Sequence, residues 1–60
     1  MEWTDKLKSG KTLIHGQGAN GLYYATIRDK DGQIESSTVV TTAAGVVKWL
    51  REHGETGSSN

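Results

Sequence analysis

A four-residue turn signal, Asp-Lys-Asp-Gly at residues 29–32, is the feature that most constrains how this chain can fold. Asp side chains accept hydrogen bonds from nearby backbone N–H groups, and Gly adopts the positive φ that a tight hairpin loop requires. The flanking segments, residues 22–28 and 33–40, contain many β-branched and aromatic residues, which are typical of strands. The sequence therefore predicts a β-hairpin centred on this turn.

Alternation divides the first of these strands into two faces: Tyr23, Ala25 and Ile27 on one, and Leu22, Tyr24, Thr26 and Arg28 on the other. In the second strand, the polar run at residues 36–38 makes the apolar alternation faint. Because a slip of one residue would exchange the two faces, the sequence leaves the register of this strand open.

A helix is predicted after this hairpin, beginning at Thr41 or Thr42, whose hydroxyl can cap its first turn. Its apolar side chains recur at i, i+3, i+4 and i+7 and form one stripe: Ala43, Val46, Val47 and Leu50. Trp49 is expected beside this stripe, over the rim of the core. Gly54 follows the helix and can end it in the left-handed backbone conformation. Gly45 costs the helix about 1 kcal/mol relative to Ala, and it can allow a strand to approach closely.

The expected fold class is α+β, a three-stranded antiparallel sheet packed against one C-terminal helix. Residues 11–15 supply the first strand, and residues 11–54 form a single domain. Residues 1–10 are expected to be a lead-in, in which Trp3 and Leu7 have a spacing compatible with one helical turn. Residues 55–60 contain no apolar side chain and are expected to be a disordered tail.

Length and charge limit the classes of function. A chain of 60 residues buries only about 60% of its unfolded surface, which leaves homodimerisation open. Seven basic residues balance seven acidic ones, so net charge favours neither nucleic acid nor an anionic membrane as partner. The chain has no Cys and no long apolar run, which predicts a cytoplasmic protein without disulfides or a membrane span.

Several motifs of enzymes and metal sites are present only in part. Residues 16–21 spell G-x-G-x-x-G, but a strand follows where a dinucleotide fold needs a helix, so a flexible turn is favoured. Residues 29–32 lack the further acidic ligands of a calcium loop. His15 and His53 have no cluster of ligands around them in the sequence. The sequence therefore predicts a protein without catalytic activity, cofactor or metal.

Three segments, residues 21–32 (GLYYATIRDKDG), 41–44 (TTAA) and 48–52 (KWLRE), resemble the arm-type DNA-binding domain at the N-terminus of tyrosine-recombinase integrases. The resemblance covers about half of the chain. It implies a sheet that enters the major groove of DNA with the face opposite the helix. The residues that it assigns to contacts with bases and phosphates are Lys11, Tyr24, Thr26, Arg28, Lys30, Ser36 and Thr38.

Two classes of function remain, and both use the exposed face of the sheet. One is a protein-interaction module, such as an inhibitor, adaptor or assembly factor, which the neutral charge and Glu35 in the last strand favour. The alternative is a small DNA-binding accessory protein, which Arg28 and Lys30 beside Tyr24 favour. A phage or mobile element is the kind of genome expected to encode either one.

Overall fold

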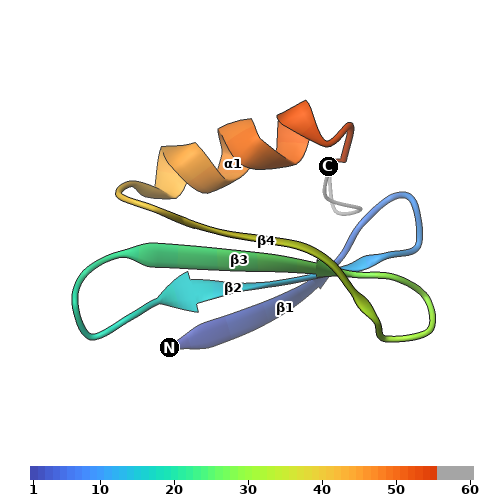
Figure 1. Cartoon of the computed structure of the whole chain (residues 1–60), viewed down its shortest axis with the longest axis horizontal. Coiled ribbons are helices and arrows are strands. Elements are labelled where there is room, and N and C mark those ends of the chain that lie inside the picture. The colour runs from blue at the N-terminus through green and yellow to red at the C-terminus, as the bar shows by residue number, and fades with distance from the viewer. Residues whose placement is uncertain (56–60) are drawn as a thin grey trace.

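The computed structural model describes residues 1–55, which form a sheet covered on one face by a helix (Figure 1). Its elements are, in chain order, β1 (Glu2–Lys6), β2 (Thr12–Gln17), β3 (Tyr23–Arg28), β4 (Ile34–Val40) and α1 (Ala43–Glu52). The strands are antiparallel and lie in the order β1-β2-β3-β4. The α+β class, the antiparallel sheet and the C-terminal helix are confirmed.

The expectation of three strands is wrong, because β1 adds a fourth at the edge of the sheet. The i, i+4 spacing of Trp3 and Leu7 does not separate the two structures, since these positions share a face in a strand as well as in a helix. All five residues of β1 are exposed, so no apolar alternation marks this strand in the sequence. Its pairing with β2 combines the backbone ladder and the hairpin with side-chain contacts of Trp3 and Asp5 to His15.

The three hairpins share one loop geometry. In each loop, the N–H of the first residue donates to the carbonyl of the residue four positions later. The residue three positions after the first is a Gly with φ between +83° and +93°, and its N–H donates to the carbonyl of the first residue. The first residues are Leu7, Gly18 and Asp29, and the glycines are Gly10, Gly21 and Gly32. This confirms the hairpin predicted at residues 29–32, where Asp29 Oδ1 also accepts from the N–H groups of Asp31 and Gln33.

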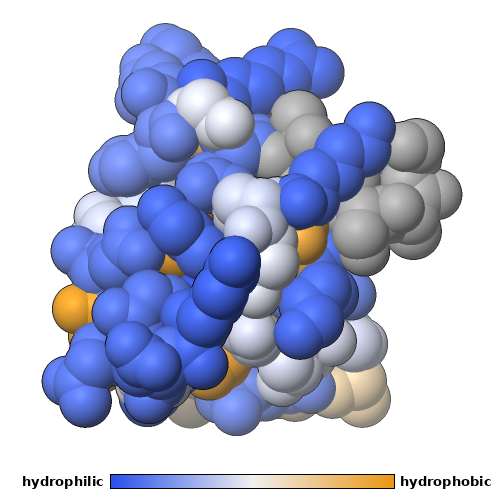
Figure 2. Space-filling view, turned by 90° about the vertical axis from the view of Figure 1, so that its right-hand side faces the viewer, coloured by the Kyte–Doolittle hydropathy of each residue, from blue (hydrophilic) through white to orange (hydrophobic). Residues whose placement is uncertain are grey.

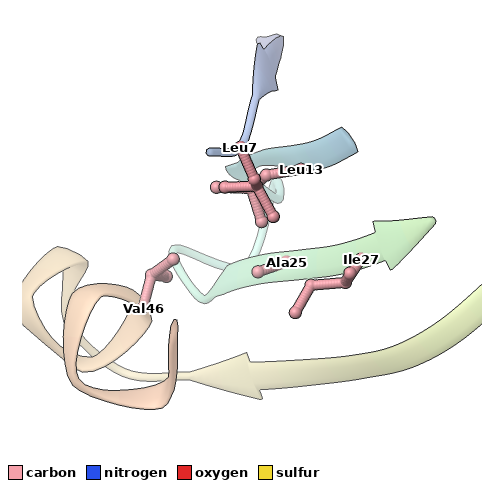
Figure 3. Close-up of a cluster of buried hydrophobic side chains, with 5 residues drawn as sticks. All are labelled: Leu7, Leu13, Ala25, Ile27 and Val46. Atoms are coloured by element: carbon pink, nitrogen blue, oxygen red, sulfur yellow. The ribbon is translucent and has the colours of Figure 1, made fainter. Parts of the chain in front are cut away.

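The core lies between the sheet and α1 (Figure 3). Its buried side chains are Leu7, Leu13, Ala25, Ile27 and Val46, and partly buried Tyr23, Val40, Trp49 and Leu50 pack around them. Tyr23, Ala25 and Ile27, which the alternation of β3 groups on one face, therefore lie together on the side of α1. The largest fully buried side chain is Leu7, which comes from the segment that the sequence assigns to the lead-in.

The ends of α1 follow the prediction, but its buried stripe differs. Thr42 caps the helix by accepting from the N–H of Gly45 at 3.1 Å, and Gly54 adopts a φ of 70°. A Cβ at Gly45 would lie 3.1 Å from Val40, so the helix backbone approaches β4 closely at this point. This contact turns Val46 and Trp49 toward the sheet and leaves Val47 half exposed.

Glu55 ends the described chain and is buried, although the sequence places it in the tail. Its N–H donates to the carbonyl of Leu50, and its carboxylate accepts a hydrogen bond of 2.7 Å from Ser9 Oγ in the β1–β2 hairpin. Residues 56–60 of the expected tail lie outside the described residues. Within residues 1–55, no helix is long and apolar enough to cross a membrane.

Candidate binding face

The face of the sheet opposite α1, called here the free face, is the surface through which a binding function would act. Directly paired residues on neighbouring strands point to the same side of a sheet, so the register fixes the composition of this face. It consists of three rows across β1 to β4: Glu2, Gly16, Tyr24 and Val39; Thr4, Ile14, Thr26 and Ser37; and Lys6, Thr12, Arg28 and Ile34.

The middle row carries no charge, and apolar side chains flank it on β4. Thr4, Ile14, Thr26 and Ser37 combine hydroxyl groups with aliphatic carbon. Val39 and Ile34, one row to either side, are 63% and 59% exposed. These two side chains are among the most exposed large hydrophobic residues of the described chain, and both belong to the free face.

Tyr24 covers the centre of one outer row. A Cβ at Gly16 would lie 2.6 Å from Tyr24 Oη, so the ring lies across the glycine of the neighbouring strand. Its hydroxyl donates to Glu2 Oε1 at 2.9 Å and so connects β3 with β1. This hydrogen bond is the main cause that raises the pKa of Tyr24 above its ordinary value. Contacts with Gly16 and Glu2 therefore hold the ring in place on the free face.

Arg28 lies at the basic end of the free face. Its Nη1 donates to the carbonyl of Gly32 at 2.7 Å, which holds the guanidinium against the β3–β4 hairpin. Lys6 occupies the same row at the other side of the sheet. Lys30 lies in the hairpin, where its side chain packs over Gly10 of the β1–β2 hairpin. Two of the predicted contact residues, Arg28 and Lys30, thus lie at the same end of the molecule.

Lys11 forms ion pairs with two carboxylates. Its Nζ lies 3.0 Å from Glu35 Oε1 and 3.5 Å from Glu55 Oε2, and the hydrogen bond to Glu35 is the first cause that raises the pKa of Lys11. These groups belong to the end of the molecule with the β1–β2 and β3–β4 hairpins, which Figure 2 shows to be mostly hydrophilic. The expected phosphate contact would have to break this ion-pair network.

Ser36 and Thr38 lie on the side of the sheet that α1 covers, together with the inner residues of β3. They pair with Ile27 and Ala25, and Ser36 Oγ lies 3.2 Å from Nε2 of His53 in the residues after α1. Ser37 and Val39 occupy the free face in their place. The faint alternation of β4 gave no signal for this register, which pairing with β3 and a bulge at Glu35 determine.

A second cluster lies on β1 and β2, on the side of the sheet that carries the helix. The rings of Trp3 and His15 stack with centroids 5.7 Å apart, and His15 Nε2 lies 2.7 Å from Asp5 Oδ2. The helix contacts β3 and β4 rather than β1 and β2, and the side chains of Asp5 and His15 are 60% and 28% exposed. Trp3 is 49% exposed and covers the imidazole of His15 rather than the core.

Within residues 1–55, no group of three His, Asp or Glu side chains is arranged to hold a metal ion. No family model matches the chain, and comparisons with curated proteins and with solved structures find no significant match. The resemblance to integrase arm-type domains therefore stays a prediction.

Proposed function

We propose that this protein is a non-catalytic binding module that contacts a protein partner through the free face. The observation that carries the proposal is the pair of exposed aliphatic side chains, Val39 and Ile34, on either side of an uncharged row of hydroxyl and aliphatic groups. Protein interfaces use such apolar anchors together with aromatic residues at their centre, and Tyr24 lies directly beside Val39.

Fixed side chains on the free face support this proposal. The ring of Tyr24 is held between Gly16 and Glu2, so it loses little conformational entropy on binding. Charges lie in the outer rows, with Glu2 in one and Lys6 and Arg28 in the other. A partner with an apolar centre and an acidic group opposite the basic row would complement this arrangement.

Duplex DNA is the second candidate, and the basic row favours it. Lys6 and Arg28 share a row in which the paired residues include no carboxylate, and Lys30 lies in the adjacent hairpin. Three cations suffice for a weak phosphate contact, whose affinity falls with salt in proportion to the number of phosphates neutralised. Lys11 adds little because Glu35 and Glu55 already pair with it.

Affinity capture with matched variants tests the proposal. The bait proteins are the wild type, Val39→Arg and Val47→Arg. Val39 and Val47 are 63% and 50% exposed, and they lie on the free face and on α1 respectively, so the two variants add the same charge to different surfaces. A host protein that binds the wild type and Val47→Arg but not Val39→Arg would support the proposal.

Titration of labelled random-sequence duplex DNA at low and moderate salt separates the two candidates. Under the main proposal the protein shows no salt-dependent binding. Binding that weakens steeply with salt and is lost in the Arg28→Ala/Lys30→Ala variant, without any captured protein that depends on Val39, would replace the main proposal by DNA binding.

A further inference from the structure

The exposed edge of the sheet at β1 has the properties of a self-pairing surface. An edge strand offers unpaired backbone N–H and C=O groups to another strand. All five residues of β1 are exposed, and its pairing with β2 runs without a bulge. We propose that two copies of this chain pair through antiparallel β1 strands around a two-fold axis at Thr4, which joins their sheets into one continuous sheet.

The backbone of β1 directs its free groups at alternate residues. Leu7 donates its N–H to Lys11 across the first hairpin at 2.9 Å, so its backbone groups point toward β2. In an antiparallel ladder this direction alternates along the strand, so the backbone groups of Glu2, Thr4 and Lys6 point away from β2. These three residues are therefore the ones that hydrogen-bond a second copy.

The charges of the same residues are complementary in this register. Pairing centred on Thr4 places Glu2 opposite Lys6 of the second copy, and the two-fold axis repeats the pair with the roles exchanged. Opposite charges directly across an antiparallel pair stabilise it, whereas like charges destabilise it. Within one copy the Cα atoms of Glu2 and Lys6 are about 13 Å apart, at about 3.3 Å a residue, so they do not neutralise each other.

Other registers of β1 are less complementary. The two paired residues must point to the same side of the joined sheet, which allows centres at Trp3, Thr4 or Asp5. A centre at Asp5 places two carboxylates opposite each other, and a centre at Trp3 leaves Lys6 without an acidic partner. A centre at Thr4 pairs Glu2 and Lys6 of each copy with the opposite charge of the other copy and uses the full length of β1.

The helix side of β1 favours the same arrangement. Pairing at Thr4 places Trp3 opposite Asp5 of the second copy and covers an indole that is 49% exposed. The two α1 helices would lie on the same side of the joined sheet but far apart, because each contacts only β3 and β4 of its own copy. The Trp3–His15 stacks of the two copies would then lie on one surface between the helices.

The opposite edge is a poorer candidate. β4 contains a bulge at Glu35, which breaks the regular ladder, and α1 packs on this strand. The contact between two β1 strands is short, so the dimer belongs to the small interfaces of weak, concentration-dependent complexes. It goes beyond the proposed function, since it leaves the free face of both copies accessible.

Sedimentation equilibrium over a wide range of protein concentration tests the proposal. The wild type is expected to rise from the monomer mass of 6.5 kDa toward the dimer as concentration increases. Lys6→Glu and Glu2→Lys each turn both charge pairs from attractive to repulsive, which should weaken self-association about tenfold or more. An equimolar mixture of the two variants restores both pairs and should form a one-to-one heterodimer.

Two further variants distinguish the β1 contact from a general effect of charge or folding. Lys8→Glu makes the same charge change in the exposed hairpin next to β1 and should leave association unchanged. Thr4→Lys places like charges on the two-fold axis and should abolish association even if Glu2→Lys disturbs folding through its bond to Tyr24. Circular dichroism establishes that each variant is folded.

Three outcomes would overturn the proposal. The first is a wild type that stays monomeric at every concentration. The second is association of Lys6→Glu or Thr4→Lys as strong as that of the wild type, which would indicate another surface such as β4. The third is a mixture of folded Lys6→Glu and Glu2→Lys that fails to associate while the wild type dimerises.

Discussion

Truncation of Leu7 tests whether the first ten residues are part of the folded unit. The Leu7 side chain is 1% exposed and packs with Leu13 and Ile27 in the core, although it comes from the first hairpin. Leu7→Ala removes three carbon atoms from this site and leaves the backbone hydrogen bonds of the hairpin in place. The variant therefore measures the packing contribution of this segment alone.

The expected loss is a large part of the total stability. At about 0.8 kcal/mol for each buried carbon, the transfer term is about 2.4 kcal/mol, and the cavity raises the loss to about 3–4 kcal/mol. A chain of this length has a total free energy of unfolding of roughly 3–9 kcal/mol, at about 0.05–0.15 kcal/mol per residue. At roughly 4–8 °C per kcal/mol, the Tm should fall by at least about 12 °C.

Thermal and urea unfolding, followed by circular dichroism, measure this loss, with Val47→Ala as the matched control. Val47 is 50% exposed, and its truncation should change stability by no more than about 0.5 kcal/mol. A loss below about 1 kcal/mol for Leu7→Ala would refute the burial of this side chain and the place of β1 in the sheet. A loss for Val47→Ala as large as for Leu7→Ala would instead refute the orientation of α1.

Three further predictions concern local interactions. The raised pKa of Tyr24 means that its hydrogen bond to Glu2 stabilises the fold below the ordinary tyrosine pKa and that this contribution is lost as pH rises through the folded pKa. In a Tyr23→Phe background, Glu2→Gln should therefore lower the pH at which Tyr24 ionises in an ultraviolet titration. An unchanged pH of ionisation would contradict the bond. Thr42→Ala should cost about 1 kcal/mol in urea unfolding, because it removes the cap of Gly45, and a neutral result would contradict that cap. Gly32→Ala should cost about 1–2 kcal/mol through its φ of +84°, although its Cβ would meet no atom within 4 Å, so an unchanged Tm would contradict the turn.

Local signals in the sequence accounted for the second half of the fold. The turn at residues 29–32 is formed by Asp29 and Gly32 through short-range hydrogen bonds that the residue types themselves favour. The cap at Thr42 and the stop at Gly54 are likewise decided within one helical turn. The alternation of β3 grouped Tyr23, Ala25 and Ile27 on one face, and packing in the folded chain decided that this face is the covered one.

The candidate site was only partly predictable. Tyr24, Thr26 and Arg28 follow from the alternation of β3, and they do share the free face. Ser36 and Thr38 were expected beside them, but they face α1, since a run of small polar residues contains no period that fixes a register. Lys11 has the charge of a phosphate ligand, but only the folded chain brings Glu35 and Glu55 to it.

What the sequence by itself determined was therefore the local structure: the hairpin turn, the helix and its ends, and the α+β class. Only the tertiary structure decided the role of residues 2–7, because an exposed edge strand has no apolar period and obtains its conformation from the neighbouring β2. It also decided which face of β4 is free and which way α1 turns, since both depend on contacts between segments far apart in the chain. Pairing with β3 decides which face of β4 is free, and the close approach of Gly45 to Val40 decides how α1 is oriented.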